Sequence, residues 1–377
     1  MPAISRRLFA SSLSCAVGAA LTPRAARSNP LHPAGAGDSA RPIIDLSSNE
    51  NPYGPSPAAL EAMTRTQAVA CRYPDLVETR VIEAIAAHHA TIPERVVLGC
   101  GSSEVLRLCD AAFLGLGRTV LAAEPTFEAV LHYAKVTRAE AVTVPLTADF
   151  RHDLAAMARA CDPRTGLVYV CNPNNPTGTI VSGDALLSFL ERVPTTAVVV
   201  VDEAYHHFVE DAGYRSAAAL VDRFPNLIVT RTFSKIYGMA GMRLGYALTS
   251  AKNAEALRAQ SAWSNVNVAV AEAALASLAD PELPARQRAL LNGTRTALCR
   301  ALDQAGRRYI PSETNFLMID VGSDVEPLIK AFEARGIKVG RRFAAMPQWL
   351  RITIGRPEET EAFFRVFGEL VKLRAAA

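Results

Sequence analysis

Short apolar runs, rich in Val, Leu and Ile, alternate with stretches of helical character over much of this chain. Runs that are short and lack polar alternation are typical of strands buried on both faces. Strands that alternate with helices form a mostly parallel sheet with helices on both faces. The sequence therefore predicts an α/β fold. The expected strands span residues 96–98, 119–122, 141–144, 167–170, 196–201 and 227–230.

Two domains are expected, because the chain has 377 residues and a single core rarely grows past about 250–300 residues. The pattern changes near Pro284, where a long helical stretch is followed by short strands and further helices. This predicts a smaller α+β domain after the sheet domain. The expected boundaries are 43–60 for an N-terminal segment that joins the small domain, 61–283 for the large domain and 284–377 for the small domain.

The composition excludes several classes of protein. The 40 basic and 37 acidic residues nearly balance, and no long basic block contains aromatic residues, so we do not expect nucleic acid as a partner. The seven cysteines form no Cys-x-x-Cys pair and no cluster with histidine, so the sequence predicts neither a metal site nor a redox pair. The pairs His88–His89 and His206–His207 are weak metal candidates, because neighbouring side chains point in different directions.

The N-terminus carries the features of an export signal. The stretch Ser5–Phe9 resembles a twin-arginine motif, and an apolar stretch over 8–21 overlaps and follows it. That stretch is too short for a good membrane-spanning helix. We therefore expect a twin-arginine-type signal peptide over 1–26, a linker over 27–42, export to the periplasm, and no membrane attachment after signal removal. The alternative is a weakly basic tail on a cytoplasmic protein.

Lys235 is the first candidate for chemistry. It follows an apolar run. Thr232 and Ser234, which carry hydroxyls, come just before it in the sequence, and Arg243 comes eight residues after it. A lysine attacks an aldehyde only as the neutral amine, a state that burial and nearby positive charge favour. The hydroxyls and the guanidinium are suited to binding a phosphate group. The alternative is an ordinary surface lysine.

Asp202 ends the apolar run over 198–201, and Tyr205 follows shortly after it. A carboxylate at the end of a buried strand is costly without a partner. A protonated pyridine nitrogen is one such partner, and Tyr205 is then placed to reach a phenolic oxygen on the same ring. The alternative for Asp202 is a helix N-cap.

Two turns add further polar groups. The stretch 171–178 contains two prolines and a glycine, which fix a rigid turn that presents Asn175. Gly101, Ser102 and Ser103 precede a helical stretch, where glycine allows close approach and the first helical amides face a bound anion. The alternatives are a plain loop for the first turn and a helix cap for the second.

Phe127 and Arg351 complete the candidates. Phe127 follows an apolar run, and its ring can stack on a flat heterocycle. Arg351 lies within an apolar run of the small domain, where a buried guanidinium needs an anion such as a substrate carboxylate. The alternatives are core packing for Phe127 and a structural salt bridge for Arg351.

Together these motifs resemble the fold-type I pyridoxal-phosphate aminotransferases of classes I and II, and in particular the histidinol-phosphate aminotransferase branch. The resemblance covers residues 45–373. The motifs that match in order are Ser48–Gly54, Arg72–Pro74, Asn174–Gly178, Asp202–Tyr205, Thr232–Lys235 and Leu350–Thr353.

The resemblance implies that pyridoxal 5'-phosphate forms a Schiff base with Lys235, which moves a proton between substrate and cofactor. Asp202 would pair with the pyridine nitrogen, and Asn175 and Tyr205 would contact the phenolic oxygen. The other implied cofactor contacts are Phe127, stacked on the ring, Gly101, Ser102, Ser103, Thr232, Ser234 and Arg243 near the phosphate, and Tyr73, donated across the interface of a homodimer. The implied substrate contacts are Arg351, which holds the α-carboxylate, Asn49, Tyr53 and Arg342.

The implied function is ping-pong transfer of an amino group from a histidinol-phosphate-like or aromatic donor to a 2-oxo acid such as 2-oxoglutarate. One alternative on the same scaffold is a pyridoxal-phosphate-dependent lyase or decarboxylase of a phosphorylated amino acid, because the reaction depends on which substrate bond lies perpendicular to the ring. Another is a non-catalytic ligand-binding protein. The presence of both Lys235 and Asp202 argues against that last alternative.

Overall fold

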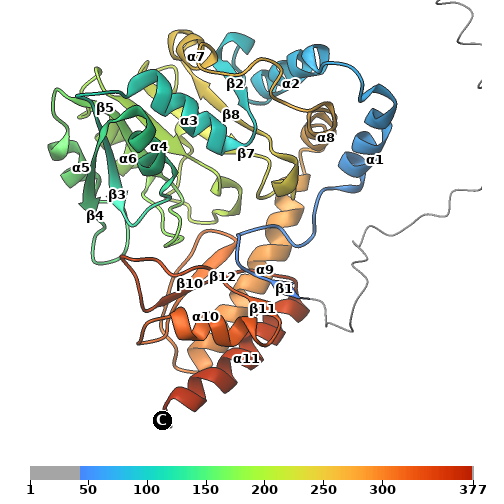
Figure 1. The fold of residues 1–377 in the computed structure, drawn as a ribbon, viewed down its shortest axis with the longest axis vertical. Helices are drawn as coiled ribbons and strands as arrows, with labels where there is room; N and C mark the ends of the chain where they lie inside the picture. Colours follow the sequence, from blue (N-terminus) through green and yellow to red (C-terminus); the bar gives the residue numbers. More distant parts are fainter. Residues whose placement is uncertain (1–42, 376–377) are drawn as a thin grey trace, which may run out of the picture. The chain divides into compact units, whose positions relative to one another are not determined.

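The computed structural model describes residues 43–375, so the predicted signal over 1–26 and linker over 27–42 lie outside the described residues. A seven-stranded sheet forms the centre of the large domain (Figure 1), with the strand order β2-β8-β7-β6-β5-β3-β4. Its strands are β2 (Val96–Gly99), β3 (Thr119–Glu124), β4 (Glu140–Pro145), β5 (Thr165–Cys171), β6 (Val198–Asp202), β7 (Leu227–Thr232) and β8 (Gly245–Thr249).

The neighbouring strands from β7 to β4 are all parallel, as the alternation of strands and helices predicts. Strand β8 is the exception, because it is antiparallel to both β2 and β7. The sequence does not predict β8, since this strand contains no Val or Ile. The predicted α/β fold with a mostly parallel sheet is confirmed.

Helices cover both faces of the sheet. Successive residues of a strand point to opposite sides, so a strand made only of apolar residues presents an apolar surface on each face. In β6, Val198 and Val200 pack into one apolar core, and Val199 and Val201 pack into the other. The first face is covered by α3 (Ser102–Phe113), α4 (Ala129–Thr137) and α7 (Ala251–Arg258), and the second by α2 (Asp75–His88), α5 (Leu154–Ala160), α6 (Gly183–Leu190) and α8 (Val268–Leu278).

Side-chain caps fix where several of these helices begin. The side chains of Ser182, Ser250 and Asn267 accept a backbone N–H from the first turn of α6, α7 and α8. Ser56 does the same for α1 (Pro57–Arg65). Such caps satisfy amides that have no partner within the helix, so local sequence sets the helix starts around the sheet.

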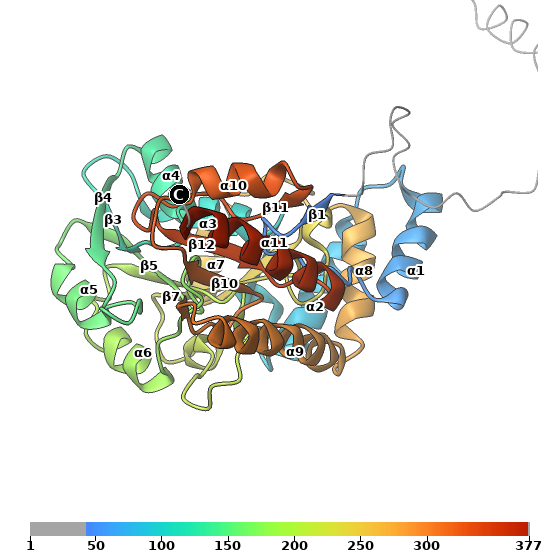
Figure 2. The same cartoon turned by 90° about the horizontal axis from the view of Figure 1, so that it is seen from below.

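A smaller α+β domain follows the sheet domain, as predicted. Its antiparallel sheet has the order β12-β10-β9, and α11 lies between α10 and α9 (Figure 2). Its elements are α9 (Leu283–Gln304), β9 (Tyr309–Ile310), β10 (Phe316–Asp320), α10 (Glu326–Glu333), β12 (Trp349–Thr353) and α11 (Pro357–Ala375).

The start of the described chain joins the small domain. Strand β1 (Ile44–Asp45) pairs in parallel with β11 (Ile337–Lys338). The segment after β1 then crosses to α1 in the large domain. The domain boundaries at residues 60/61 and 283/284 remain predictions.

Among residues 43–375, no helix is long and apolar enough to cross a bilayer, and no group of three or more His, Cys, Asp or Glu side chains is placed to hold a metal ion.

Several histidines are partly or fully buried. The rings of His206 and His207 lie 3.7 Å apart. Burial lowers the pKa of both histidines well below the usual value.

Acid should therefore destabilise the fold. Burial lowers the pKa of His89 to about 3 and of His152 to about 4, whereas an unfolded histidine has a pKa of about 6.5. The folded state binds fewer protons, so its stability is complete above about pH 6.5 and falls as the pH decreases toward 5. Thermal unfolding followed by circular dichroism from pH 8 to pH 5 should show a falling midpoint.

His152→Gln is the matched variant, because glutamine can still hydrogen-bond Asn174, which His152 contacts at 3.3 Å, but does not titrate. Its unfolding midpoint should decline less steeply with acid than that of the wild type. A midpoint that stays constant in the wild type between pH 7 and pH 5 would contradict the prediction.

Candidate active site

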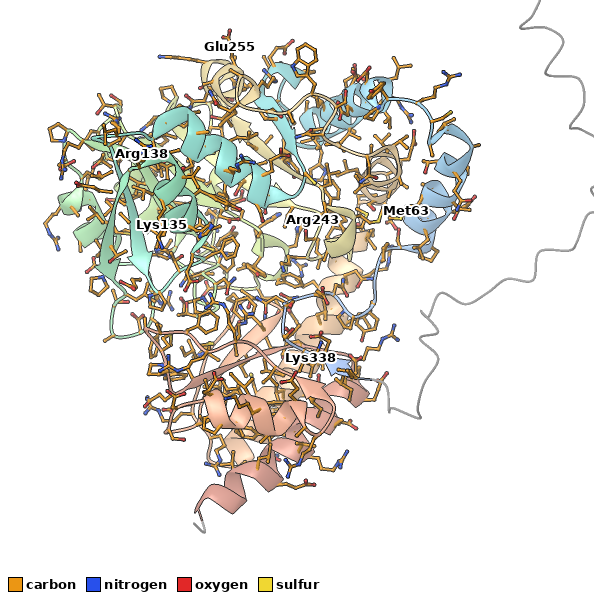
Figure 3. All side chains as sticks on the ribbon, in the orientation of Figure 1. Met63, Lys135, Arg138, Arg243, Glu255 and Lys338 are labelled. Atoms are coloured by element: carbon orange, nitrogen blue, oxygen red, sulfur yellow. The ribbon has the colours of Figure 1, made fainter. Side chains whose placement is uncertain are left out.

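A cavity of about 750 Å³ lies where the large domain meets the small domain. Its wall takes residues from the carboxyl edge of the large sheet, from the segment after β1, and from α10 and β11. Arg243 of the large domain and Lys338 of the small domain, both labelled in Figure 3, belong to this wall. Among the predicted residues, the wall carries Asn49, Ser102, Ser103, Phe127, Asn175, Asp202, Tyr205, Thr232, Ser234, Lys235, Arg243 and Arg351.

The parallel strands explain why these residues meet. The carboxyl ends of parallel strands share one edge of the sheet, which is where ligands bind in α/β proteins. Asn175 follows β5, Asp202 ends β6, and Lys235 follows β7, and these three strands are neighbours. One sheet edge thus brings together three motifs that are far apart in the sequence.

Lys235 is held by two main-chain carbonyls. Its Nζ donates to the carbonyl oxygens of Asn49 at 3.0 Å and Ser48 at 3.3 Å. Burial, assisted by the positive charge of Arg351, lowers the pKa of Lys235 to about 8. An exposed lysine has a pKa of about 10.4, so far more of Lys235 is the neutral amine that attacks an aldehyde. An ordinary surface lysine would not have this environment.

Asp202 is a buried carboxylate without a cationic partner among the described residues. Its oxygens accept from the Tyr169 hydroxyl at 2.9 Å and from the Ala204 amide at 3.1 Å. Burial raises its pKa, so a cation placed beside it would stabilise the charged form. The N-cap alternative is wrong, because the next helical turn is His206–Phe208 and Tyr205 precedes it.

A group of hydroxyls surrounds the Arg243 guanidinium. Arg243 donates to the Ser234 hydroxyl at 3.2 Å, and the Thr232 hydroxyl donates to Ser234 at 2.9 Å. Ser102 and Ser103 begin α3, so the unpaired amides of its first turn are at the same wall. One guanidinium, four hydroxyls and a helix N-terminus together form a site that fits a phosphate group.

Gly101 allows the Arg243 guanidinium to approach the start of α3 closely. Its φ is +81°, in the left-handed region that favours glycine, and a Cβ atom there would collide with the Arg243 guanidinium. Gly101 does not line the cavity itself. It lets the Ser102 turn and Arg243 approach each other.

Arg351 is a buried guanidinium on β12 with only neutral partners. It donates to the Asn175 side-chain oxygen at 2.8 Å and to the Ser47 carbonyl at 2.7 Å. Within the described part of the chain, its Nε has no hydrogen-bond partner and it forms no ion pair with a carboxylate, so the structural salt-bridge alternative is wrong. Burial lowers the pKa of Arg351 to about 10. The arrangement fits a carboxylate ligand, which would supply the missing charge.

Phe127 and Asn49 belong to the wall in different ways. Phe127 reaches the cavity and also packs against the apolar core next to α3 and α4, so it satisfies both the stacking and the packing interpretation. Asn49 is buried, and its side-chain amide donates to the Tyr205 hydroxyl at 3.0 Å. The side chain predicted to contact substrate is thus bonded within the protein.

Arg342 differs from its predicted role. Its Nε donates to both carboxylate oxygens of Asp324, at 2.9 and 3.1 Å, and its Nη2 lies 2.8 Å from the same carboxylate. Arg342 does not line the cavity of this chain. The structure instead places Arg341 on the wall, where it pairs with Glu128 at 2.6 Å. The two neighbouring arginines pair with different carboxylates, and the pattern of residue types alone did not distinguish them.

Two predicted tyrosines also lie outside this cavity. Tyr53 lines a separate apolar groove beside α9 and α11, and the Arg356 guanidinium lies 5.1 Å from its ring centre. Tyr73 is 85% exposed and lines a shallow depression between α1 and the segment before α8. In a single chain, neither side chain reaches Lys235.

The main chain contributes groups that residue types do not reveal. The carbonyls of Ser47, Ser48 and Asn49 hold two cations of the cavity, the buried Arg351 and the partly buried Lys235. No side-chain pattern identifies a functional carbonyl. Tyr169, which donates to Asp202, could have been noticed as the one hydroxyl-bearing aromatic within an otherwise apolar run.

Comparison with known proteins decides between the chemistries that this geometry allows. A family model for class I and II aminotransferases matches residues 41–367. The chain belongs to the class I and II aminotransferases. It is 38% identical over 332 residues to a histidinol-phosphate aminotransferase of Moorella thermoacetica, covering 87% of this chain and 86% of that protein.

Two further relatives agree with this assignment. The aminotransferase is 37% identical over 351 residues to an aromatic amino acid aminotransferase of Cutibacterium acnes, covering 92% of this chain and 97% of that one. It resembles the crystal structure of histidinol-phosphate aminotransferase from Sinorhizobium meliloti in complex with pyridoxal-5'-phosphate, with a TM-score of 0.82, 27% identity, and coverage of 89% of this chain and 92% of that chain.

This protein is therefore a pyridoxal-phosphate-dependent transaminase, and the predicted family and cofactor are confirmed. The residues present fit the cofactor, because an unpaired buried carboxylate, a low-pKa lysine and a cationic hydroxyl-lined site occupy one wall. Family membership favours amino transfer over the lyase and non-catalytic alternatives.

Gly101→Ala tests the phosphate site. The added methyl group should displace the Arg243 guanidinium and weaken binding of pyridoxal phosphate by about 10- to 100-fold, the value of one hydrogen bond to a charged group. Gly115→Ala is the control, because its Cβ would enter open space. Equilibrium binding of the cofactor to the apoenzyme measures both, and an unchanged affinity in Gly101→Ala would refute the assignment.

Proposed function

We propose that this aminotransferase transfers an amino group from a histidinol-phosphate-like or aromatic donor to a 2-oxo acid such as 2-oxoglutarate, in a ping-pong cycle at Lys235. The observation that carries the proposal is the Arg351 guanidinium, which is buried without a counterion from residues 43–375 in the wall that also holds Lys235. The relatives named for histidinol phosphate and for aromatic amino acids support this donor class.

The chain's own residues would hold the cofactor by complementary charge. The Lys235 amine would bond its aldehyde carbon, Asp202 would pair with the pyridine nitrogen, and Arg243 would bind the phosphate. When bound, pyridoxal phosphate supplies a ring that withdraws the electron pair left behind when a proton leaves the donor's carbon. Asp202 favours this withdrawal, because its negative charge keeps the pyridine nitrogen protonated.

Lys235 would also move the proton. Its lowered pKa of about 8 lies near neutral pH, which suits a group that must both accept and release a proton. The carbonyls of Ser48 and Asn49 bind the ammonium form at 3.3 and 3.0 Å. These contacts keep Nζ in the cavity wall while the lysine is not bonded to the cofactor.

Arg351 and Arg341 would divide the work of binding substrate. Arg351 would hold the α-carboxylate of the 2-oxo acid or amino acid, exchanging its neutral partners for a charged one. Arg341 lines the same cavity, and its guanidinium lies 4.3 Å from the centre of the Phe343 ring. It would bind a second anionic group, such as the phosphate of a histidinol-phosphate-like donor, in competition with Glu128.

Three large apolar side chains of the large domain are exposed. Tyr73, Leu76 and Trp263 are 85%, 86% and 97% exposed, which is unusual for large apolar side chains and supports a homodimer interface on this face. We propose that Tyr73 reaches the cofactor phosphate of the partner copy across that interface.

We also propose export of the folded enzyme, which the predicted twin-arginine-type signal over 1–26 supports.

An amino-donor screen tests the proposed function. The cofactor-loaded enzyme is mixed with histidinol phosphate, phenylalanine, tyrosine or glutamate, and the visible spectrum should change to that of the aminated cofactor with at least one donor. Subsequent addition of 2-oxoglutarate should restore the original spectrum. Conversion by none of the donors would refute the proposal, as would turnover like that of the wild type in Lys235→Ala.

Substitution of the two arginines should separate their roles. Arg351→Gln should lower kcat/KM for every substrate by about 30- to 1000-fold, because about 2–4 kcal/mol of charge-assisted binding is lost. Arg341→Gln should lower kcat/KM for histidinol phosphate more than for phenylalanine. Equal losses for both donors in Arg341→Gln would contradict a second anion site, and unchanged kinetics in Arg351→Gln would contradict the carboxylate assignment.

A further inference from the structure

We propose that Asn49 is a positioning residue, whose side chain orients the hydroxyl of Tyr205 while its main-chain carbonyl holds the amine of Lys235. Asn49 lies in the segment between β1 and α1 and is 1% exposed. The inference rests on the proposed function, because it gives Asn49 a role in the same reaction. It differs from the predicted direct contact between Asn49 and substrate.

The backbone of Asn49 is held in an uncommon conformation. Its φ is +56°, in the left-handed region that only Gly and, less readily, Asn and Asp adopt at low cost. Its N–H donates to the Thr353 hydroxyl at 2.9 Å. Its carbonyl accepts from Lys235 at 3.0 Å and from the Asn315 side chain at 3.0 Å. This conformation places the carbonyl against the lysine.

The hydrogen bonds of Thr353 determine which end of the Asn49 amide faces Tyr205. The Thr353 hydroxyl accepts the Asn49 N–H, so its own proton is free to reach the Asn49 side-chain oxygen, which lies 3.4 Å away. The amide nitrogen is then the end that faces Tyr205, and it donates to the Tyr205 oxygen at 3.0 Å. Both ends of the amide are therefore bonded within the protein.

This donation determines where the Tyr205 proton points. A phenolic oxygen that accepts from an amide directs its own hydrogen away from that donor. The rest of the Tyr205 environment is apolar on one side, because the Phe316 ring packs edge-on with its centre 5.1 Å away. The hydroxyl proton is thus directed into the cavity, where the phenolic oxygen of the cofactor would accept it.

Asn49 also joins the two domains at the reacting groups. Thr353 and Asn315 belong to the small domain, whereas Tyr205 and Lys235 belong to the large domain. Arg351, two residues before Thr353 on β12, completes the link by donating to the Ser47 carbonyl. Asn49 therefore contacts both Lys235 and Tyr205 of the large domain while it is bonded to two residues of the small domain.

Asn49→Gly is the informative variant, because glycine keeps the left-handed backbone and the carbonyl but removes the amide. A hydroxyl proton directed at the cofactor's phenolic oxygen stabilises negative charge there and favours loss of the proton on the lysine-bound nitrogen. Without the amide, the pKa of the visible lysine–cofactor absorption should rise by about half a unit to one unit. A spectrophotometric pH titration of the cofactor-loaded enzyme measures this value.

Asn49→Ala is the matched control for folding. It also removes the amide, so the same pKa rise is expected. Alanine is strained at this φ, so its thermal unfolding midpoint should be lower than that of Asn49→Gly. A double-mutant cycle identifies the route: in a Tyr205→Phe background, Asn49→Gly should cause no further rise.

Either of two results would overturn the proposal. The first is an unchanged absorption pKa in Asn49→Gly. The second is a shift of equal size in the Tyr205→Phe background, which would mean that Asn49 acts without Tyr205. Failure of the proposed function is distinguishable, because it would appear as absence of amino transfer in the wild type, while the titration still compares the variants.

Discussion

Buried charge without a counterion is the constraint on which this site depends. Lys235, Asp202 and Arg351 share one cavity wall, and their only described hydrogen-bond partners are neutral groups. Burial shifts the pKa of each toward its uncharged form. Each shift marks a place where a ligand of opposite charge, or a covalent bond, relieves the cost. Pyridoxal phosphate and a substrate carboxylate supply these partners.

A buried ion pair lies on the opposite side of the same strands. Glu203 follows Asp202 and points to the other face, where Arg231 of β7 pairs with it at 2.8 Å. Both side chains are buried, and Glu203 also accepts from Ser216 and the Ala217 amide. This pair is fully satisfied, so it ties β6 to β7 directly behind the cavity. Strand alternation thus separates a satisfied structural charge from an unsatisfied functional one.

Sequence predicts those parts of the protein that residue type and order determine. Continuous apolar runs located six strands of the large sheet, and the charged residues that end or follow these runs identified Asp202 and Lys235. Residue type did not determine direction: Arg342 was predicted for the cavity, yet Arg341 lines it. Strand β8 was missed, because it contains no Val or Ile. The contacts of Asn49 arise from its backbone conformation and from residues more than 150 positions away, which no local pattern encodes.

Lys235, partly buried at the sheet edge with a lowered pKa, is the amine that we expect to hold the cofactor. Reduction of the cofactor-loaded enzyme with borohydride fixes the cofactor to whichever amine bears it, and peptide mapping by mass spectrometry then locates the label. We expect one labelled peptide, with the cofactor on Lys235. Labelling of another lysine, such as Lys338, which also lines the cavity, would contradict this assignment, as would no label in an enzyme that binds cofactor and transfers amino groups.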